Sequence, residues 1–284
     1  MRRKLKVKKW RFILLLALCL SFAIINMAQS QNGDRGIFEV FQGDAIKEEQ
    51  IHQGNLLLVN DNYPIKEESI KSDIVNLFKH KDLVIGYELS DSEIKLSEDV
   101  AQRFSEMVSA AANDGIHHFV LNSGFRSFDK QRGLYEEKGS QYALPPGYSE
   151  HNLGLSLDVG STQMKMSEAP EGEWIEHNAW KYGFILRYPK NKTNITGIEY
   201  EPWHIRYIGL PHSAIMKENN FVLEEYLNYL KEEKNVAGMV NGKEYTVTYY
   251  SVSEFMNIKL SENQTYEISG NNVDGVILTT FSDQ

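Results

Sequence analysis

The chain has very little cysteine: a single residue, Cys19, among 284. Cys19 lies in an apolar run near the N-terminus, so the rest of the sequence holds no thiol from which a disulfide could form. The residues beyond position 53 number about 230, which is enough to bury a substantial core. We therefore expect core burial and bound metal, rather than disulfides, to hold the fold together.

Positive charge is scarce outside the N-terminus. The chain has 30 Lys and Arg residues against 39 Asp and Glu, and seven of the basic residues precede Phe12, which leaves 23 against 39. Such an acidic body argues against a protein that binds nucleic acid. It suits a domain that stands off an anionic cell envelope.

The sequence also lacks the Lys-Thr-Gly triplet that accompanies Ser-x-x-Lys in penicillin-binding serine enzymes. Two Ser-x-x-Lys matches occur, at residues 92–95 and 127–130. Matches this short arise easily by chance, and Ser127 is expected to cap a helix. The composition therefore disfavours a serine nucleophile.

Two short segments carry most of the chemistry: residues 149–158 (SEHNLGLSLD) and residues 201–204 (EPWH). Together they offer His151, Asp158 and His204 as three metal ligands, and three protein ligands with one open position are typical of catalytic zinc. The remaining carboxylate, Glu201, can take a proton from an activated water as general base. The pattern predicts a zinc hydrolase; a wall-binding module without activity is the alternative, but it would not need both the ligand set and a spare glutamate.

The spacing also predicts how the ligands are presented. Apolar residues alternate with polar ones over residues 155–160, which indicates a strand with Asp158 on the face opposite the leucines. His151 precedes this strand in a turn where Gly154 can adopt unusual backbone angles. Pro202 excludes a helix at residues 201–204, so His204 is expected at the start of a second strand.

The order of elements predicts an α+β protein in four parts. Residues 1–28 combine a basic cluster with an apolar run at 12–25, which indicates export, with a signal-anchor favoured over a cleaved signal. Residues 29–53 are expected to be a spacer, residues 54–234 the catalytic domain, and residues 235–284 a small β-rich subdomain with a hairpin at Asn241-Gly242. The catalytic domain would then lie outside the cytoplasm, held at the cell membrane by one N-terminal anchor.

A family resemblance adds to this interpretation. The two ligand segments resemble those of the LAS-type zinc peptidases of bacterial peptidoglycan, and further segments from about residue 53 onward are similar to the VanY-type D-alanyl-D-alanine carboxypeptidases: residues 123–126 (SGFR), 142–145 (YALP), 178–188 (NAWKYGFILRY) and 200–207 (YEPWHIRY).

The resemblance implies a core with a small central antiparallel sheet flanked by helices, and Zn²⁺ as cofactor. It implies that Arg126, Gln131 and Ser149 contact the substrate, with Arg126 on a terminal carboxylate or on the developing oxyanion. The implied substrates are peptidoglycan stem peptides ending in D-Ala-D-Ala, whose trimming would contribute to glycopeptide resistance. L,D-carboxypeptidase and D,D-dipeptidase activity remain alternatives, since both use the same kind of site.

The aromatic residues near these segments are expected to be core and pocket wall. Trp203, between Glu201 and His204, is given that role, whereas Tyr148 and Tyr200 are candidates for lining a substrate groove.

Overall fold

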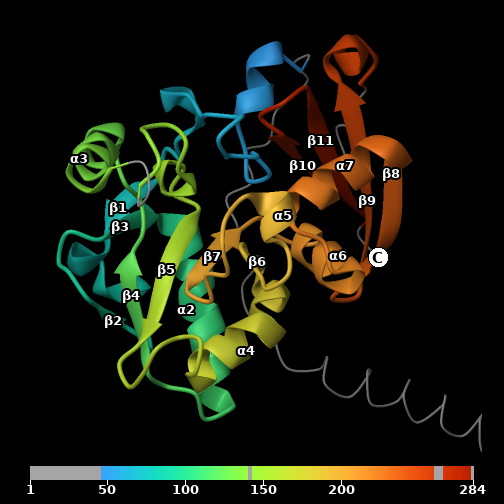
Figure 1. Cartoon of the computed structure of the whole chain (residues 1–284). Helices are drawn as coiled ribbons and strands as arrows, with labels where there is room; N and C mark the ends of the chain where they lie inside the picture. The colour runs from blue at the N-terminus through green and yellow to red at the C-terminus, as the bar shows by residue number, and fades with distance from the viewer. Residues whose placement is uncertain (1–45, 140–142, 259–264, 283–284) are drawn as a thin grey trace, which may run out of the picture. The chain divides into compact units, whose positions relative to one another are not determined.

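The computed structural model describes residues 46–139, 143–258 and 265–282, which all fall within one compact unit, Val40–Gln284 (Figure 1). The predicted N-terminal anchor and most of the predicted spacer lie outside the described residues. None of the helices in the described part of the chain has the length and apolar content that crossing a bilayer requires.

A five-stranded sheet in the order β2-β4-β5-β7-β6 lies at the centre of the catalytic part. Its neighbours are antiparallel except for the parallel pair β2 and β4. The small antiparallel sheet of the α+β prediction is thereby confirmed, with β2 as the exception. The strands are β2 (Glu88–Leu89), β4 (Phe119–Ser123), β5 (Ser156–Ser161), β6 (Phe184–Leu186) and β7 (His204–Tyr207).

Helix α2 (Glu98–Asn113) packs its apolar face into the main core, whereas α3 (Phe128–Lys138) buries only Gln131. Helix α2 begins where the Ser97 side chain accepts from the Val100 backbone N–H, and its Phe104 is completely buried in the main core. Helix α3 begins in the same way at Ser127, as the sequence predicted. The other elements of this part are β1 (Ile74–Asn76), β3 (Lys95–Ser97), α4 (Pro170–Asn178) and α5 (Thr193–Thr196).

A second, four-stranded antiparallel sheet in the order β10-β11-β9-β8 follows α6 (His212–Asn219) and α7 (Leu223–Glu233). Asn241 and Gly242 both have positive φ, 49° and 77°, which suits the predicted two-residue hairpin turn between β8 and β9. The strands are β8 (Asn235–Val240), β9 (Lys243–Ser251), β10 (Thr265–Gly270) and β11 (Gly275–Ser282).

The folded body starts earlier than Gly54, the first residue of the predicted catalytic domain. Glu48–His52 forms a 3-10 helix whose Ile51 is buried. The chain then runs beside β10 and the following loop: the Gly270 N–H donates to the Gln53 carbonyl at 2.7 Å and the Leu58 N–H to the Asn271 carbonyl at 3.1 Å. The last residues of the predicted spacer are thus part of the fold, because Ile46 and Ile51 pack into an apolar cluster with Val276.

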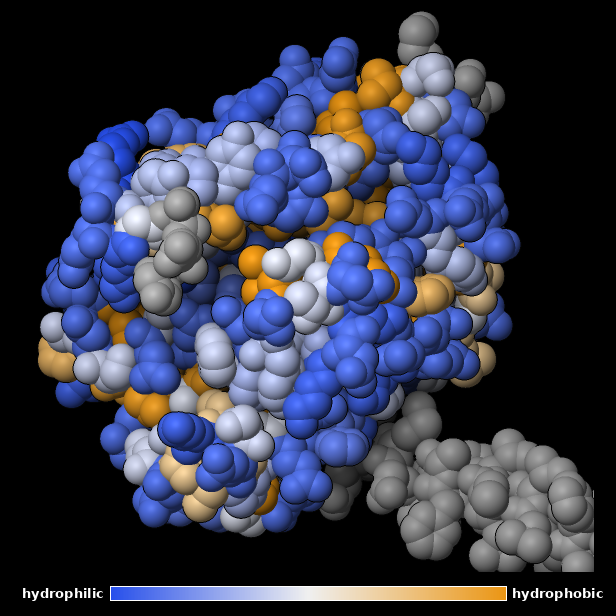
Figure 2. All heavy atoms as spheres, viewed as in Figure 1, coloured by the Kyte–Doolittle hydropathy of each residue, from blue (hydrophilic) through white to orange (hydrophobic). Residues whose placement is uncertain are grey.

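The face of the molecule drawn in Figure 2 is largely hydrophilic, and its apolar residues gather in small groups. This surface agrees with the 24% of charged residues in the sequence.

A buried histidine joins α6, α7 and the C-terminal sheet. His212 Nδ1 lies 2.7 Å from the Tyr226 hydroxyl, and His212 Nε2 lies 3.1 Å from Thr279 Oγ1. Burial lowers the pKa of His212 to about 3, so the imidazole is neutral in the folded protein. In the unfolded chain the same group takes a proton near pH 6.5, and acid therefore favours unfolding through this residue.

We expect the stability advantage of the wild-type chain over His212→Gln to shrink by about 1.4 kcal/mol between pH 7.5 and pH 5.5, since one proton is taken up on unfolding. Denaturant titrations in excess chelator at the two pH values measure this difference. His117→Gln, at an exposed histidine, is the matched control and should show no such trend. An advantage that stays constant or grows in acid contradicts the assignment.

Candidate active site

Two neighbouring strands bring the predicted ligands together. Strands β5 and β7 are antiparallel, and their register pairs Asp158 directly with His204. Leu155, Leu157 and Val159 are completely or almost completely buried, which confirms the alternation expected before and within β5. Asp158 and His204 therefore project from one face of the sheet, as cross-strand neighbours do.

His151 reaches the same place from a short 3-10 helix, Glu150–Asn152, that precedes β5. Gly154 closes this turn with φ of 86°, an angle that favours glycine, and a Cβ there would lie 2.4 Å from Ile74 Cδ1, so the Ile74 side chain would have to move as well. Asn152 ties the turn to a neighbouring loop by donating to the Arg126 carbonyl at 2.7 Å.

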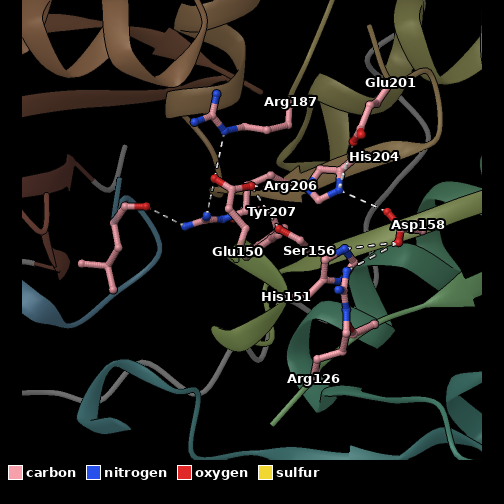
Figure 3. A network of polar contacts seen from close by, with 12 residues as sticks. Arg126, Glu150, His151, Ser156, Asp158, Arg187, Glu201, His204, Arg206 and Tyr207 are labelled. Carbon is pink, nitrogen blue, oxygen red and sulfur yellow. Dashed lines mark hydrogen bonds and ion pairs between the residues drawn. The ribbon is translucent and has the colours of Figure 1, made fainter. Parts of the chain in front are cut away.

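The three side chains converge on one point (Figure 3). His151 Nε2 lies 3.2 Å from Asp158 Oδ2, and His204 Nδ1 lies 3.1 Å from Asp158 Oδ1. The three ligand atoms are all within 4.8 Å of one another. Ligands of a tetrahedral zinc ion at its usual bond lengths are about 3.3 Å apart. The donor set and its spacing therefore fit Zn²⁺.

Each histidine has an acceptor at its other ring nitrogen. His151 Nδ1 lies 2.7 Å from the Gly124 carbonyl, and His204 Nε2 lies 3.4 Å from Glu150 Oε2. Such acceptors take the ring proton and leave Nε2 of His151 and Nδ1 of His204 free to bind a metal.

The electrostatics of the group favour a cation. Burial opposes charge on Asp158, but the charges and hydrogen bonds of His151 and His204 hold its pKa well below the usual value. Burial also opposes charge on His204, yet Asp158 and Glu150 raise its pKa to about 9. Burial lowers the pKa of His151. Glu150 and Asp158 thus favour a proton on each ring nitrogen of His204, and a divalent cation would replace the Nδ1 proton beside Asp158.

Glu201 lies beside the ligand group without being part of it. Its Oε2 is 3.8 Å from His204 Nδ1, and its side chain is 29% exposed. Burial raises the pKa of Glu201, although the charge of His204 opposes the shift. A carboxylate with raised pKa next to a metal site is suited to accepting and returning a proton near neutral pH.

Two of the residues implied to contact substrate, Arg126 and Gln131, lie on the Asp158 side of the site. Arg126 Nη1 donates to Gln131 Oε1 at 3.0 Å, and Arg126 Nη2 lies 3.9 Å from Asp158 Oδ2. Gln131 is held in turn by donating to the Leu144 carbonyl at 2.6 Å. Ser149 is buried two residues before His151. The structure therefore brings His151, Asp158, His204 and Glu201 together, with Arg126 and Gln131 beside them, while the substrate contact of Ser149 stays a prediction.

Trp203 is 41% exposed, so the expectation that it packs in the core was wrong, whereas its place in a pocket wall stays a prediction. It lies just before β7, which begins at His204. Tyr148 and Tyr200 are half-buried, as residues that line a groove can be.

Sequence analysis missed a buried charge cluster behind the ligands. Glu150 lies between two charged partners, with Arg187 Nε 2.8 Å and Arg206 Nη1 2.9 Å from its Oε1. Burial alone would raise the pKa of Glu150, but the two arginines and His204 lower it, so the carboxylate is ionised. The available signal was Arg206 itself, a charged residue two positions after a ligand in a short strand.

A small antiparallel sheet that carries a His-Asp-His group with a free carboxylate beside it defines a zinc metallopeptidase. Comparison with known proteins narrows this class. Residues 93–210 match the family model described as VanY, D-alanyl-D-alanine carboxypeptidase. A D-alanyl-D-alanine carboxypeptidase of Enterococcus faecium is 63% identical over 246 residues, which cover 87% of this chain and 81% of the relative. The chain belongs to the VanY family of D-alanyl-D-alanine carboxypeptidases.

Two solved structures show the same likeness. The vancomycin resistance D,D-dipeptidase VanXYg, in complex with a D-Ala-D-Ala phosphinate analogue, matches with a TM-score of 0.70 and 30% identity, covering 84% of this chain and 98% of that one. The vancomycin resistance D,D-pentapeptidase VanY from a VanB-type cassette, in complex with Zn(II), matches with a TM-score of 0.50 and 30% identity, covering 61% of this chain and 99% of that one.

Proposed function

We propose that this protein is a zinc D,D-carboxypeptidase that removes the terminal D-Ala from peptidoglycan pentapeptide stems and thereby contributes to glycopeptide resistance. The observation that carries the proposal is the convergence of His151, Asp158 and His204, with Glu201 3.8 Å from the last of them. The identity with the Enterococcus faecium carboxypeptidase supports the choice of reaction.

His151, Asp158 and His204 would hold the ion. When bound, zinc supplies Lewis-acid chemistry that acidifies a water and polarises a carbonyl. Glu201 takes one proton from the water, and the oxygen of the water adds to the carbonyl carbon of the penultimate residue of the stem peptide. When the C–N bond breaks, Glu201 returns this proton to the departing amino group, and D-Ala leaves. Arg126 is placed on the Asp158 side of the site, where its guanidinium can hold an anionic substrate oxygen.

Glu201→Gln should keep bound zinc and lose turnover by at least about 10²-fold, the usual contribution of a general acid–base group. His151→Ala and His204→Ala should lose zinc as well as activity. Metal analysis and stem-peptide hydrolysis of the purified variants test both statements. If Glu201→Gln lost stoichiometric zinc while His204→Ala retained it, the roles assigned here would be reversed.

Arg126→Ala should reduce kcat/KM for the stem peptide without loss of zinc. A charge-assisted hydrogen bond contributes about 1.5–3 kcal/mol, which corresponds to a roughly ten- to hundredfold effect. Arg132→Ala is the matched control, because Arg132 lies on α3 close by but is 56% exposed and pairs only with the exposed Asp129 among the described residues. Equal losses of kcat/KM in the two variants would show that Arg126 does not contact the substrate.

The competing activity is that of a D,D-dipeptidase, which the likeness to VanXYg favours. We expect instead that one D-Ala is released from pentapeptide, that free D-Ala-D-Ala is cut poorly, and that tetrapeptide is not trimmed. Mass spectrometry of the purified protein with each of the three substrates decides the matter. A higher kcat/KM for the free dipeptide would make it a dipeptidase, and faster trimming of tetrapeptide would make it an L,D-carboxypeptidase.

The proposed membrane localisation rests on the sequence of residues 1–28, in which seven basic residues are followed by the apolar run at 12–25. On this basis we propose that an N-terminal anchor holds the catalytic part outside the cytoplasm. The full chain should then sediment with membranes, and a chain without residues 1–28 should not. Full-length protein recovered in the supernatant after cell lysis would contradict the anchor.

A further inference from the structure

Glu150 is the most deeply buried carboxylate near the metal ligands, with a side chain only 1% exposed. It adjoins His151 in sequence, yet it faces away from the ligand point and into the protein (Figure 3). A buried carboxylate is costly unless charged partners and hydrogen bonds compensate it. The groups around Glu150 must therefore compensate for the burial of its carboxylate.

Each carboxylate oxygen of Glu150 has its own set of partners. Oε1 accepts from Arg187 Nε at 2.8 Å and pairs with Arg206 Nη1 at 2.9 Å. Oε2 accepts from Ser156 Oγ at 3.2 Å and lies 3.4 Å from His204 Nε2. One oxygen is thus fixed by two arginines, and the other is aimed at a metal ligand.

The contact with His204 decides which ring nitrogen faces the metal. A carboxylate acceptor at Nε2 keeps a proton on that nitrogen, so Nδ1, 3.1 Å from Asp158 Oδ1 at the ligand point, is the nitrogen that gives up its proton to bind a metal. The ring proton of His151 is held in the same way, but by a neutral backbone carbonyl. His204 differs in having a charged acceptor, which makes it the more basic ligand.

The two arginines are themselves anchored on distant segments. Arg187 makes a two-pronged pair with Glu224 of α7, with N–O distances of 2.9 and 2.6 Å. Arg206 Nη2 donates to the carbonyls of Asn55 at 3.0 Å and Leu57 at 3.1 Å. Glu150 is therefore held through Arg187 by α7 and through Arg206 by residues 55–57, called the N-terminal segment below.

Both anchoring segments pack against the C-terminal sheet. The Leu56 N–H donates to Ser269 Oγ of β10 at 2.8 Å. Tyr226 and Leu230 of α7 belong to the same apolar cluster as Val247 of β9 and Ile277 of β11. A continuous set of contacts thus runs from the C-terminal sheet through the arginines to Glu150 and His204.

We propose that Glu150 is a positioning residue for the zinc site: it orients His204 for metal binding, and Arg187 and Arg206 lock it in place from α7 and the N-terminal segment. The role assigned to the C-terminal sheet is to support these anchors. This inference rests on the proposed function only in taking His204 as a zinc ligand.

The test is the zinc affinity of the full-length protein, measured by competition with a chelator of known affinity. Glu150→Gln should weaken zinc binding about ten- to hundredfold, the usual effect of removing an outer partner of a ligand. The absorption bands of the cobalt(II)-substituted protein should shift in the same variant, because the His204 ligand changes its orientation. Loss of packing alone would not move these bands in a variant that retains a native circular dichroism spectrum.

Two neighbouring carboxylates on α7 provide a matched pair. Glu224→Gln removes the anchor of Arg187 and should weaken zinc binding severalfold. Glu225→Gln removes a carboxylate that pairs with Lys192 at 2.7 Å and should leave zinc affinity unchanged. Unchanged affinity in both Glu150→Gln and Glu224→Gln would overturn the proposal.

If Glu150→Gln does not fold, Arg187→Lys decides, because lysine keeps the charge but cannot bridge Glu150 and Glu224 with a fork of donors. A folded Arg187→Lys protein with weakened zinc binding supports the proposal, and one with wild-type affinity overturns it. Failure of the proposed function is separate: the wild-type chain would then bind zinc without hydrolysing stem peptides, whatever the variants showed.

Discussion

The pairing of Asp158 with His204 across β5 and β7 is the constraint on which the rest of the site depends. Side chains alternate between the faces of a strand, so a slip of one residue in this register would send one of the two ligands to the opposite face. The three residue pairs between β5 and β7 therefore position the metal site as well as holding the sheet together.

The same register also sets the polar layer behind the ligands. Arg206 follows His204 by two residues and pairs with Ser156 in β5, just as His204 pairs with Asp158. Ser156 and Arg206 are completely buried, and both contact Glu150. One strand pairing thus places the ligands and the residues that support them on the same face of the sheet, two residues apart along each strand.

Local sequence signals predicted much of this arrangement. Alternation predicted β5, the cap at Ser127 predicted the start of α3, and Asn241-Gly242 predicted the hairpin, because each feature depends on residues close together in the chain. The seven candidate site residues were identified from two motifs and a resemblance. These features required no knowledge of which strands are neighbours.

What escaped prediction depends on contacts between distant segments. Arg187 is 37 residues from both Glu150 and Glu224, and Arg206 bonds to carbonyls about 150 residues earlier. No periodic pattern marks such partners. The burial of Trp203 was overestimated for a related reason: its apolar character indicates a preference for burial, but it lies just before β7 and is 41% exposed.

The charge cluster is better explained by the geometry it imposes than by stability. Replacing a buried ion pair with apolar residues is often neutral or stabilising, whereas removing one partner typically costs about 3–5 kcal/mol. Glu150, Arg187, Glu224 and Arg206 therefore tolerate few alternative packings, since any shift would leave a buried charge without a partner. A set of groups that penalises displacement in this way is suited to holding a metal ligand in one orientation. It also suggests a role for a C-terminal sheet that carries none of the proposed catalytic groups: the arginines need fixed partners, and α7 and residues 55–57, which supply them, pack against that sheet.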